Sequence, residues 1–218
     1  MKEYRNILFD LDGTLIDSKE GIINAIKYAL QYLDFEIPPT EELDKFIGPP
    51  IREPFEKYYN LDKADTEIAV EKFREFYKVT GVKQTSLYPG IIEMLKTLKN
   101  NGKKVLLVTS KTEFFARQIL DNLGIFKYFD FVTGATFDGS RAKKGDLLKY
   151  TISKTGISAH ESIMVGDKKH DIIGAKEVGM DSIGVLYGYG SLEELKDANA
   201  GFIASNVMDI LEAINLKS

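Results

Sequence analysis

Short runs of apolar residues recur along the chain, and small, polar or acidic residues follow each run. Runs of this length are typical of buried strands in a parallel sheet. The predicted strands are Asn6–Leu11, Lys104–Thr109, Asp130–Thr133, Ser162–Val165 and Ser182–Leu186. From position 88 onward they alternate with stretches in which apolar residues recur at helical spacing. This alternation predicts a doubly wound parallel α/β sheet.

Positions 16–85 interrupt this alternation, because their pattern is helical throughout. The first helix of this stretch has an apolar stripe that comprises Ile22, Ile23, Ile26, Ala29, Leu30 and Leu33. Polar and glycine residues flank the stretch at positions 17–21 and 84–90, where they suit a hinge. We therefore predict an all-helical, mobile cap at 16–85, inserted into an α/β core that comprises 1–15 and 86–218.

Composition and charge narrow the possible functions. With 218 residues, of which 44% are hydrophobic, the chain can bury a sizeable core. The absence of cysteine excludes disulfides, thiolate metal sites and a cysteine nucleophile. A net charge of -4 with interspersed basic and acidic residues leaves no basic surface for a nucleic acid polymer. Without a signal peptide or a membrane-spanning apolar stretch, we expect a cytoplasmic protein with no membrane partner.

The first predicted strand ends in a pair of carboxylates. Ligands of a doubly wound sheet bind beyond the carboxyl ends of its strands. Strand alternation points Asp10 and Asp12 to the same side of this edge. Two neighbouring carboxylates need a counter-charge, and hard oxygen ligands suit Mg²⁺. The pair predicts a cation site, although a solvated turn at Gly13 would also account for an isolated Asp-x-Asp.

Two other predicted strands end in groups that suit phosphate chemistry. Thr109 and Ser110 offer hydroxyls and free helix-start amides that can hold a phosphoryl oxygen. Asp167 adds a third carboxylate at a strand end, and Asp171 adds a fourth one helical turn later. Each of these residues alone also fits a helix cap or a surface ion pair. Their combination at successive strand ends favours one shared site.

The combination resembles the haloacid dehalogenase (HAD) superfamily of phosphotransferases, and the resemblance covers essentially the full chain. The sequence Asp-Leu-Asp-Gly-Thr-Leu at 10–15 resembles the first motif and Thr109 the second, a lysine provides the third, and Gly166-Asp167 with Asp171 the fourth. The core then resembles the Rossmann-like HAD core, and the helical insertion resembles the C1 cap. Within the superfamily, the short cap and the Phe-Ile-Gly-Pro-Pro stretch at 46–50 look most like the phosphoglycolate phosphatase group.

The resemblance implies a role for each acidic residue. It makes Asp10 the nucleophile and Asp12 the acid and base of a reaction through an aspartyl phosphate. It makes Asp10, the backbone carbonyl of Asp12, and Asp167 the Mg²⁺ ligands, with Asp171 as their support. Thr109, Ser110 and a lysine are then expected to bind the phosphoryl group.

Two assignments are choices between alternatives. Lys143 and Lys144 compete for the lysine motif, and the resemblance favours Lys144, because family members of this type typically place the lysine directly before a short helix like the one predicted from Asp146. Either lysine also fits a solvated surface position. Arg52 is the candidate specificity residue of the cap, because a guanidinium can grip a carboxylate or a second phosphate through two hydrogen bonds. An exposed arginine paired with Glu53 or Glu56 is the alternative.

These inferences predict a Mg²⁺-dependent phosphatase that acts as a monomer or homodimer on a small soluble phosphomonoester, such as a phosphoglycolate-like compound, a nucleotide or a sugar phosphate. A β-phosphoglucomutase-like phosphomutase is the alternative, followed by a non-catalytic binding protein with the same fold. Halide removal is disfavoured, because relatives with that activity lack an aspartate at the position of Asp12.

Overall fold

The central sheet has six parallel strands in the order β5-β4-β1-β6-β7-β8. The structure, a computed structural model, describes residues 3–216, so the outermost positions of the predicted core lie outside the described residues. The strands are β1 (Asn6–Phe9), β4 (Lys104–Thr112), β5 (Phe131–Ala135), β6 (Ser162–Gly166), β7 (Asp181–Val185) and β8 (Phe202–Ala204). The chain moves outward from β1 through β4 to β5 and then crosses to the other side of β1. This order confirms the doubly wound class and places a crevice beyond the ends of β4, β1 and β6.

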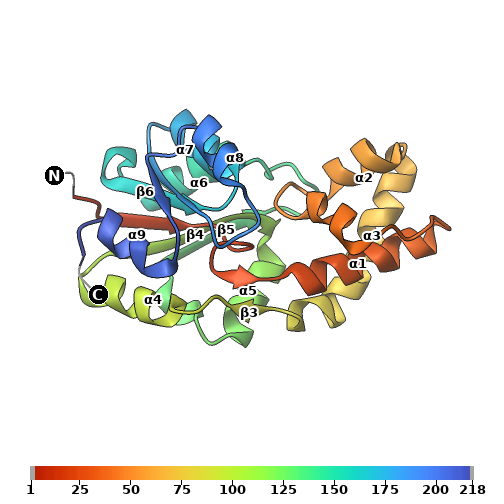
Figure 1. The fold of residues 1–218 in the computed structure, drawn as a ribbon, viewed down its shortest axis with the longest axis horizontal. Coiled ribbons are helices and arrows are strands. Elements are labelled where there is room, and N and C mark those ends of the chain that lie inside the picture. The colour runs from red at the N-terminus through yellow and green to blue at the C-terminus, as the bar shows by residue number, and fades with distance from the viewer. Residues whose placement is uncertain (1–2, 217–218) are drawn as a thin grey trace.

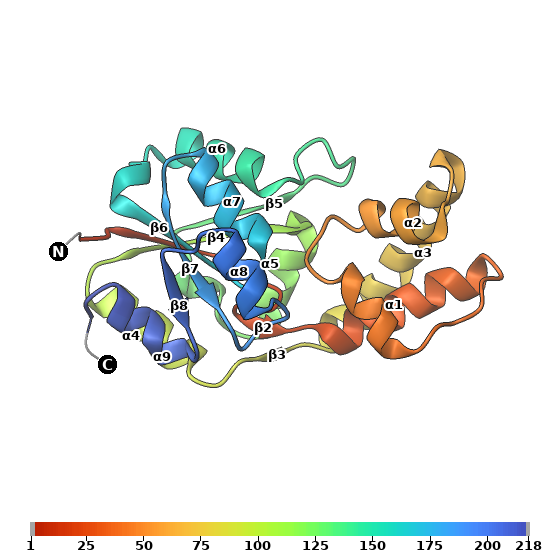
Figure 2. The same ribbon diagram turned by 45° about the horizontal axis from the view of Figure 1, so that its top comes forward.

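Alternation along the strands divides the hydrophobic core into two layers. Ile7 and Phe9 belong to one buried cluster, and Leu8 between them belongs to the other. Helices α4 (Ile91–Asn100), α5 (Glu113–Asn122) and α9 (Val207–Ala213) pack in the first layer, and α6 (Lys144–Thr155) and α7 (Lys169–Glu177) pack in the second. Helix α8 (Leu192–Asp197) lies beside α7 (Figure 2). Because helices cover both faces, the strand interiors are apolar and polar side chains collect at the strand ends.

A helical segment is inserted between two short strands, β2 (Ile16–Asp17) and β3 (Ser86–Leu87). It contains α1 (Lys19–Tyr32), α2 (Arg52–Tyr59) and α3 (Lys63–Val79) and lies beyond the carboxyl ends of the sheet strands (Figure 1). β2 and β3 pair antiparallel, so both connections to the sheet run side by side. Short 3-10 helices occur at Thr40–Phe46, Gly81–Lys83, Phe126–Tyr128 and Ala159–Glu161. The insertion makes the fold an α/β sheet with an all-helical cap.

Some element bounds differ from the sequence prediction. β1 ends at Phe9 because the chain turns after Asp10, and in this turn the amide of Gly13 donates to the carbonyl of Ile16 at 2.9 Å. β4 continues three residues beyond the predicted end at Thr109. β8 has only three residues and was not predicted. An apolar run of that length carries too little pattern to distinguish it from a loop.

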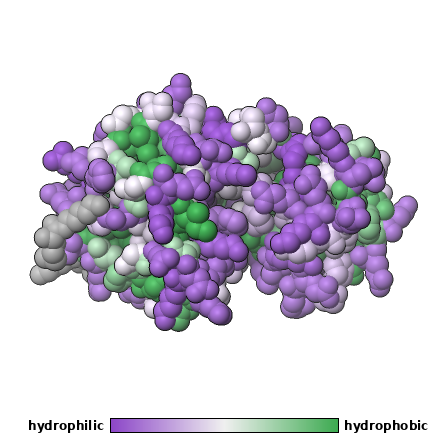
Figure 3. All heavy atoms as spheres, turned by 90° about the horizontal axis from the view of Figure 1, so that it is seen from above, coloured by the Kyte–Doolittle hydropathy of each residue, from purple (hydrophilic) through white to green (hydrophobic). Residues whose placement is uncertain are grey.

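The surface is mostly hydrophilic on the face drawn in Figure 3, where the sheet part and the helical part meet at a narrower waist. Within residues 3–216, no helix has both the length and the apolar composition needed to cross a membrane.

Candidate active site

The side chain of Asp10 lies at the end of β1, beside a buried lysine. Its own backbone amide donates to the carbonyl of Val165, which fixes it between β1 and β6. The ammonium of Lys144 lies 2.8 Å from a carboxylate oxygen of Asp10 and 2.8 Å from one of Asp171. The same ammonium donates to the carbonyl of Val108 at 2.8 Å. Lys144 is the first residue of α6 and is only 5% exposed, so the start of this helix delivers a positive charge to the strand ends.

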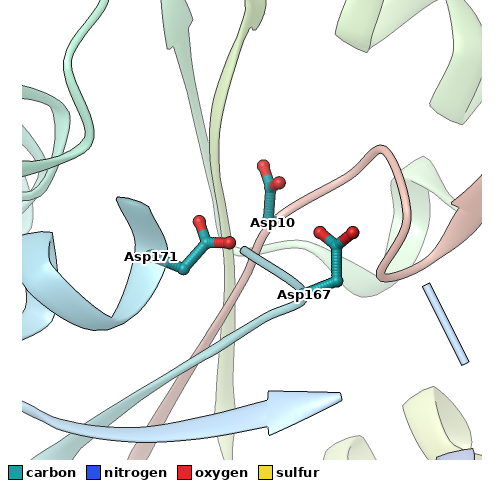
Figure 4. A group of neighbouring side chains, drawn as sticks. All are labelled: Asp10, Asp167 and Asp171. Atoms are coloured by element: carbon teal, nitrogen blue, oxygen red, sulfur yellow. The ribbon is translucent and has the colours of Figure 1, made fainter. Parts of the chain in front are cut away.

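A third carboxylate completes an acidic cluster at this edge. Asp167 follows β6 directly, and the amide of Tyr189 donates to it at 2.8 Å. Asp171 lies in the first turn of α7 and accepts a hydrogen bond from the amide of Lys168 at 3.1 Å. Oxygens of Asp10, Asp167 and Asp171 all lie within 4.8 Å of one another, and the three carboxylates converge in Figure 4. Three oxygen donors at this spacing could hold a divalent cation.

The charges of this cluster are not balanced. Burial raises the pKa of Asp10 to about 6, although the neighbouring Lys144 opposes the rise. Burial also raises the pKa of Asp167 well above its usual range, and the charges of Asp171 and Asp10 add to the effect. Burial alone would lower the pKa of Lys144, but its two carboxylate partners outweigh burial and the pKa lies above its usual value. One lysine facing three carboxylates leaves excess negative charge, which a cation would neutralise.

Asp12 lies on the turn after β1 and has different partners from Asp10. Both of its carboxylate oxygens accept from the ammonium of Lys111 at 2.8 Å, and the hydroxyl of Ser18 donates to one of them. Gly13 follows with a φ of +77°, which favours glycine. A Cβ at Gly13 would also overlap the carboxylate of Asp167. The turn therefore depends on glycine for both its backbone conformation and its close approach to the acidic cluster.

Thr109 and Ser110 lie on the extended end of β4, next to β1 in the sheet. Thr109 is buried, and its hydroxyl oxygen accepts from the amide of Lys111 at 3.2 Å. The hydroxyl of Ser110 donates to the carbonyl of Ala142 at 3.0 Å. β4 thus presents both hydroxyls at the edge from which Asp10 projects.

The two candidate lysines differ sharply, and Arg52 has a partner that the sequence did not suggest. Lys144 contacts Asp10, whereas Lys143 is exposed at the residue before α6. Arg52 begins α2 and binds Glu67 through two hydrogen bonds, at 2.9 and 2.6 Å. It does not pair with Glu53 or Glu56 among the described residues, and it borders a cavity that also contacts Ser110.

Sequence reasoning missed three partners of the acidic residues, namely Ser18, Lys111 and Tyr189. Lys111 follows the two hydroxyl residues of β4, but its partner Asp12 lies 99 positions away in the chain. Tyr189 lies in the loop after β7, and residues that follow a strand of a doubly wound sheet are candidates for the ligand site. Its amide holds Asp167, and its hydroxyl donates to Asp17 at 2.8 Å. Tyr189 therefore connects the acidic cluster to the segment that leads into the cap.

Comparison with known proteins identifies the family. Residues 7–185 match the family model for haloacid dehalogenase-like hydrolases. A 5'-nucleotidase from Pseudomonas aeruginosa is 39% identical over 193 residues, which cover 88% of this chain and 87% of that protein. A phosphoglycolate phosphatase from Vibrio parahaemolyticus is 32% identical over 98% of this chain and 97% of its own length. The crystal structure of a predicted phosphatase from Clostridium acetobutylicum has a TM-score of 0.95 and 38% identity, and the match covers 98% of this chain and 99% of that one.

The family match spans most of the chain, and the three relatives reported above are named as a 5'-nucleotidase, a phosphoglycolate phosphatase and a predicted phosphatase. The fold, with its doubly wound sheet and inserted helices, agrees with this relationship. The chain therefore belongs to the haloacid dehalogenase-like hydrolase family, and it is a phosphatase of that family.

Proposed function

We propose that this phosphatase hydrolyses a small soluble phosphomonoester with the help of Mg²⁺, through an aspartyl phosphate formed on Asp10. The observation that carries the proposal is the buried contact of Asp10 with Lys144, next to the carboxylates of Asp167 and Asp171. A nucleophilic carboxylate needs a fixed position and a nearby positive group that also attracts the phosphoryl group. The contact supplies both.

Asp10 is the proposed nucleophile. Its carboxylate oxygen attacks phosphorus in line with the departing alkoxide, so that a P–O bond to Asp10 forms as the ester bond breaks. Lys144 holds this carboxylate at 2.8 Å and balances negative charge on the phosphoryl oxygens. Thr109 and Ser110, on the adjacent strand, are the proposed donors to the phosphoryl oxygens.

Asp12 is the proposed acid and base. It gives a proton to the departing alkoxide and then removes a proton from the water that attacks the phosphorus of the aspartyl phosphate. This second attack releases phosphate and regenerates the Asp10 carboxylate. Lys111 and Ser18 hold the Asp12 carboxylate in place, and it does not belong to the group of carboxylates that could hold a cation.

The acidic cluster fits a magnesium ion. Asp10 and Asp167 are the proposed side-chain ligands, together with the backbone carbonyl of Asp12, and Asp171 supports them through its contact with Lys144. The donors are hard oxygens with excess negative charge, which is the donor set that Mg²⁺ prefers. When bound, the ion neutralises charge on both the carboxylates and the phosphate ester.

The cap closes the site over a small leaving group. A cavity of about 70 Å³, called the Asp12 cavity here, adjoins Asp12 and is lined by Ile22, Phe46, Gly48, Pro49, Ile51, Phe73, Tyr77, Ser110, Lys111 and Thr112. Its volume is below that of typical ligand pockets, so it admits only a compact group. Arg52 is the proposed specificity residue of the cap. We further propose that the enzyme is cytoplasmic and works as a monomer or homodimer, in keeping with its lack of cysteine.

Asp10→Asn tests the proposed nucleophile, because a neutral amide cannot attack phosphorus effectively. Phosphate release should be measured from phosphoglycolate, nucleoside monophosphates, sugar phosphates and an aryl phosphate, with Mg²⁺ and with a chelator. We expect Mg²⁺-dependent release that the variant abolishes while its circular dichroism spectrum stays unchanged. Asp121→Asn, at an exposed position near the end of α5, is the matched control.

Two results would contradict the proposal. Turnover by Asp10→Asn close to that of the unmodified enzyme would remove Asp10 from the reaction. Phosphoryl transfer between sugar phosphates without net phosphate release would favour the phosphomutase alternative instead.

A further inference from the structure

A second cavity adjoins the Asp12 cavity and carries three basic side chains. It measures about 240 Å³, and we name it the cationic cavity. It is lined by Pro50, Ile51, Arg52, Glu53, Glu56, Arg74, Ser110, Thr112, Ala135, Thr136, Gly139, Ala142 and Lys143. Ile51, Ser110 and Thr112 line both cavities. The two cavities therefore meet at these three residues, and Asp12 lines the first of them.

The basic side chains keep free hydrogen-bond donors. Glu67 accepts hydrogen bonds from the Nε and Nη2 groups of Arg52. The Nη1 group of Arg52 faces Gly139 on the cavity wall and lies 3.8 Å from the position that a Cβ atom at residue 139 would take. Arg74 donates through Nη2 to the carbonyl of Phe137 at 2.7 Å. Within residues 3–216, no carboxylate forms an ion pair with Arg74 or Lys143. The cavity thus holds cationic donors that its own walls leave unsatisfied.

Arg74 carries its positive charge in a partly buried position beside a second arginine. Burial lowers the pKa of Arg74, the positive charge of Arg52 lowers it further, and the carboxylate of Glu67, which pairs with Arg52, opposes the change. The two acidic residues of the wall, Glu53 and Glu56, are exposed and form no ion pair with these arginines in the described part of the chain. Glu67 forms an ion pair with Arg52 but not with Arg74 in the described part of the chain, so a further anion beside Arg74 would contact a guanidinium group that no carboxylate pairs with.

Three helices also begin at this cavity without a side-chain cap. The residues that precede α2, α5 and α6 are Ile51, Thr112 and Lys143, and all three line the cavity. None of the three forms a side-chain hydrogen bond to its helix. Free amides and the positive ends of helix dipoles attract anions. They reinforce the charge of the basic side chains from both the cap and the sheet part.

We propose that the cationic cavity binds a second anionic group of the substrate, a carboxylate or a second phosphate remote from the ester bond that breaks. This inference rests on the proposed phosphatase reaction at Asp10 and deepens it by naming the substrate class. The preferred esters carry a negative charge at the end opposite the reacting phosphoryl group. Arg74 and Lys143 act with Arg52 as specificity residues.

The test compares phosphomonoesters that differ only in their far end. Alkyl phosphates of increasing chain length should end in a carboxylate, in the neutral carboxamide of the same shape, or in a second phosphate. At the chain length that reaches the cavity, we expect kcat/KM to be about tenfold or more higher for an anionic ester than for its carboxamide. Whether the carboxylate or the phosphate ester gains more identifies the anionic group.

Arg74→Gln and Lys143→Gln should each lower this charged-to-neutral ratio severalfold. Lys149→Gln, at an exposed position of the same helix as Lys144, should leave the ratio unchanged. The side chain of Lys143 is exposed and makes no hydrogen bond among the described residues, so its variant stays informative even if Arg74→Gln disturbs the contact between cap and sheet part.

The two proposals fail in distinguishable ways. A charged-to-neutral ratio near one at every chain length, or a ratio that neither variant changes, overturns the anion subsite. Magnesium-dependent turnover of an aryl phosphate, absent in Asp10→Asn, would then still support the phosphatase reaction. If the enzyme releases phosphate from no ester, both the proposed reaction and the anion subsite are wrong.

Discussion

Asp167→Asn separates the electrostatic role of the acidic cluster from its packing. The side chain of Asp167 is fully buried, and asparagine has nearly the same shape. The amide oxygen of asparagine can still accept the hydrogen bond from the backbone amide of Tyr189, which is 2.8 Å long in the unmodified protein. The hydroxyl of Thr14 lies 3.4 Å from the other carboxylate oxygen of Asp167. The substitution therefore removes mainly a negative charge. In the absence of metal, we expect the variant to be more stable than the unmodified protein.

The size of this gain follows from the spacing of the carboxylates. Asp10, Asp167 and Asp171 offer oxygens within 4.8 Å of one another. Two negative charges at that separation repel by about 3 kcal/mol at an effective dielectric constant of about 20. Lys144 pairs with Asp10 and Asp171 but forms no ion pair with Asp167 among the described residues. After solvent and conformational relaxation, we expect a gain of about 1–3 kcal/mol, or roughly 2–12 °C in Tm.

Thermal unfolding with chelator and with Mg²⁺ measures both roles of the cluster. At a Mg²⁺ concentration of about 100 times Kd, binding should stabilise the unmodified protein by about 2.7 kcal/mol, or roughly 5–11 °C. The Asp167→Asn variant should show a much smaller shift, whereas the Asp121→Asn control should behave like the unmodified protein. If Asp167→Asn lowered the metal-free Tm and kept the full Mg²⁺ shift, both the electrostatic argument and the metal site would be refuted.

Two further predictions concern protons at the site. Burial raises the pKa of Asp10 to about 6, so the carboxyl group of Asp10 binds a proton more tightly in the folded metal-free protein than in the unfolded chain. The stability that this proton contributes to the folded protein is lost as pH rises from about 4 to about 6. Because Mg²⁺ competes with this proton for Asp10, the increase in Tm caused by Mg²⁺ should become larger over the same pH range. An equal Mg²⁺-induced increase in Tm at about pH 5 and about pH 7.5 would contradict this prediction. Asp12→Asn should reduce kcat for an alkyl phosphate more than for an activated aryl phosphate, whose leaving group needs little protonation. Equal losses for the two esters would remove the acid role of Asp12.

The fold class was predictable because apolar strand runs and helical spacing alternate along most of the chain. The same runs predicted where the polar groups collect, since Asp10, Thr109 and Asp167 each follow or end such a run. Their mutual contacts follow from parallel pairing, which brings strand ends to one edge. The exact end of β4 was not predictable, because its last residues are polar and pair with β5 only after an irregularity.

The partners of the acidic residues were harder to predict. Lys143 and Lys144 are adjacent at a helix start, so the backbone direction before α6 decides which one turns inward. Lys111 meets Asp12 only in the folded chain, and no local pattern links residues so far apart. Tyr189 holds Asp167 through its backbone amide, which any residue except proline could supply. Sequence patterns predict where a side chain lies along an element better than which distant group it contacts.

The distribution of buried charge argues that the acidic cluster is functional. Five charged residues are buried in the described part of the chain, and four of them, Asp10, Lys144, Asp167 and Asp171, form this one cluster. A structural ion pair would need only one carboxylate for the lysine, and additional buried carboxylates destabilise the metal-free fold. A chain that otherwise keeps its charges at the surface has no structural reason to concentrate them here. Binding a cation and a phosphate ester provides that reason, which a non-catalytic protein with the same fold would lack.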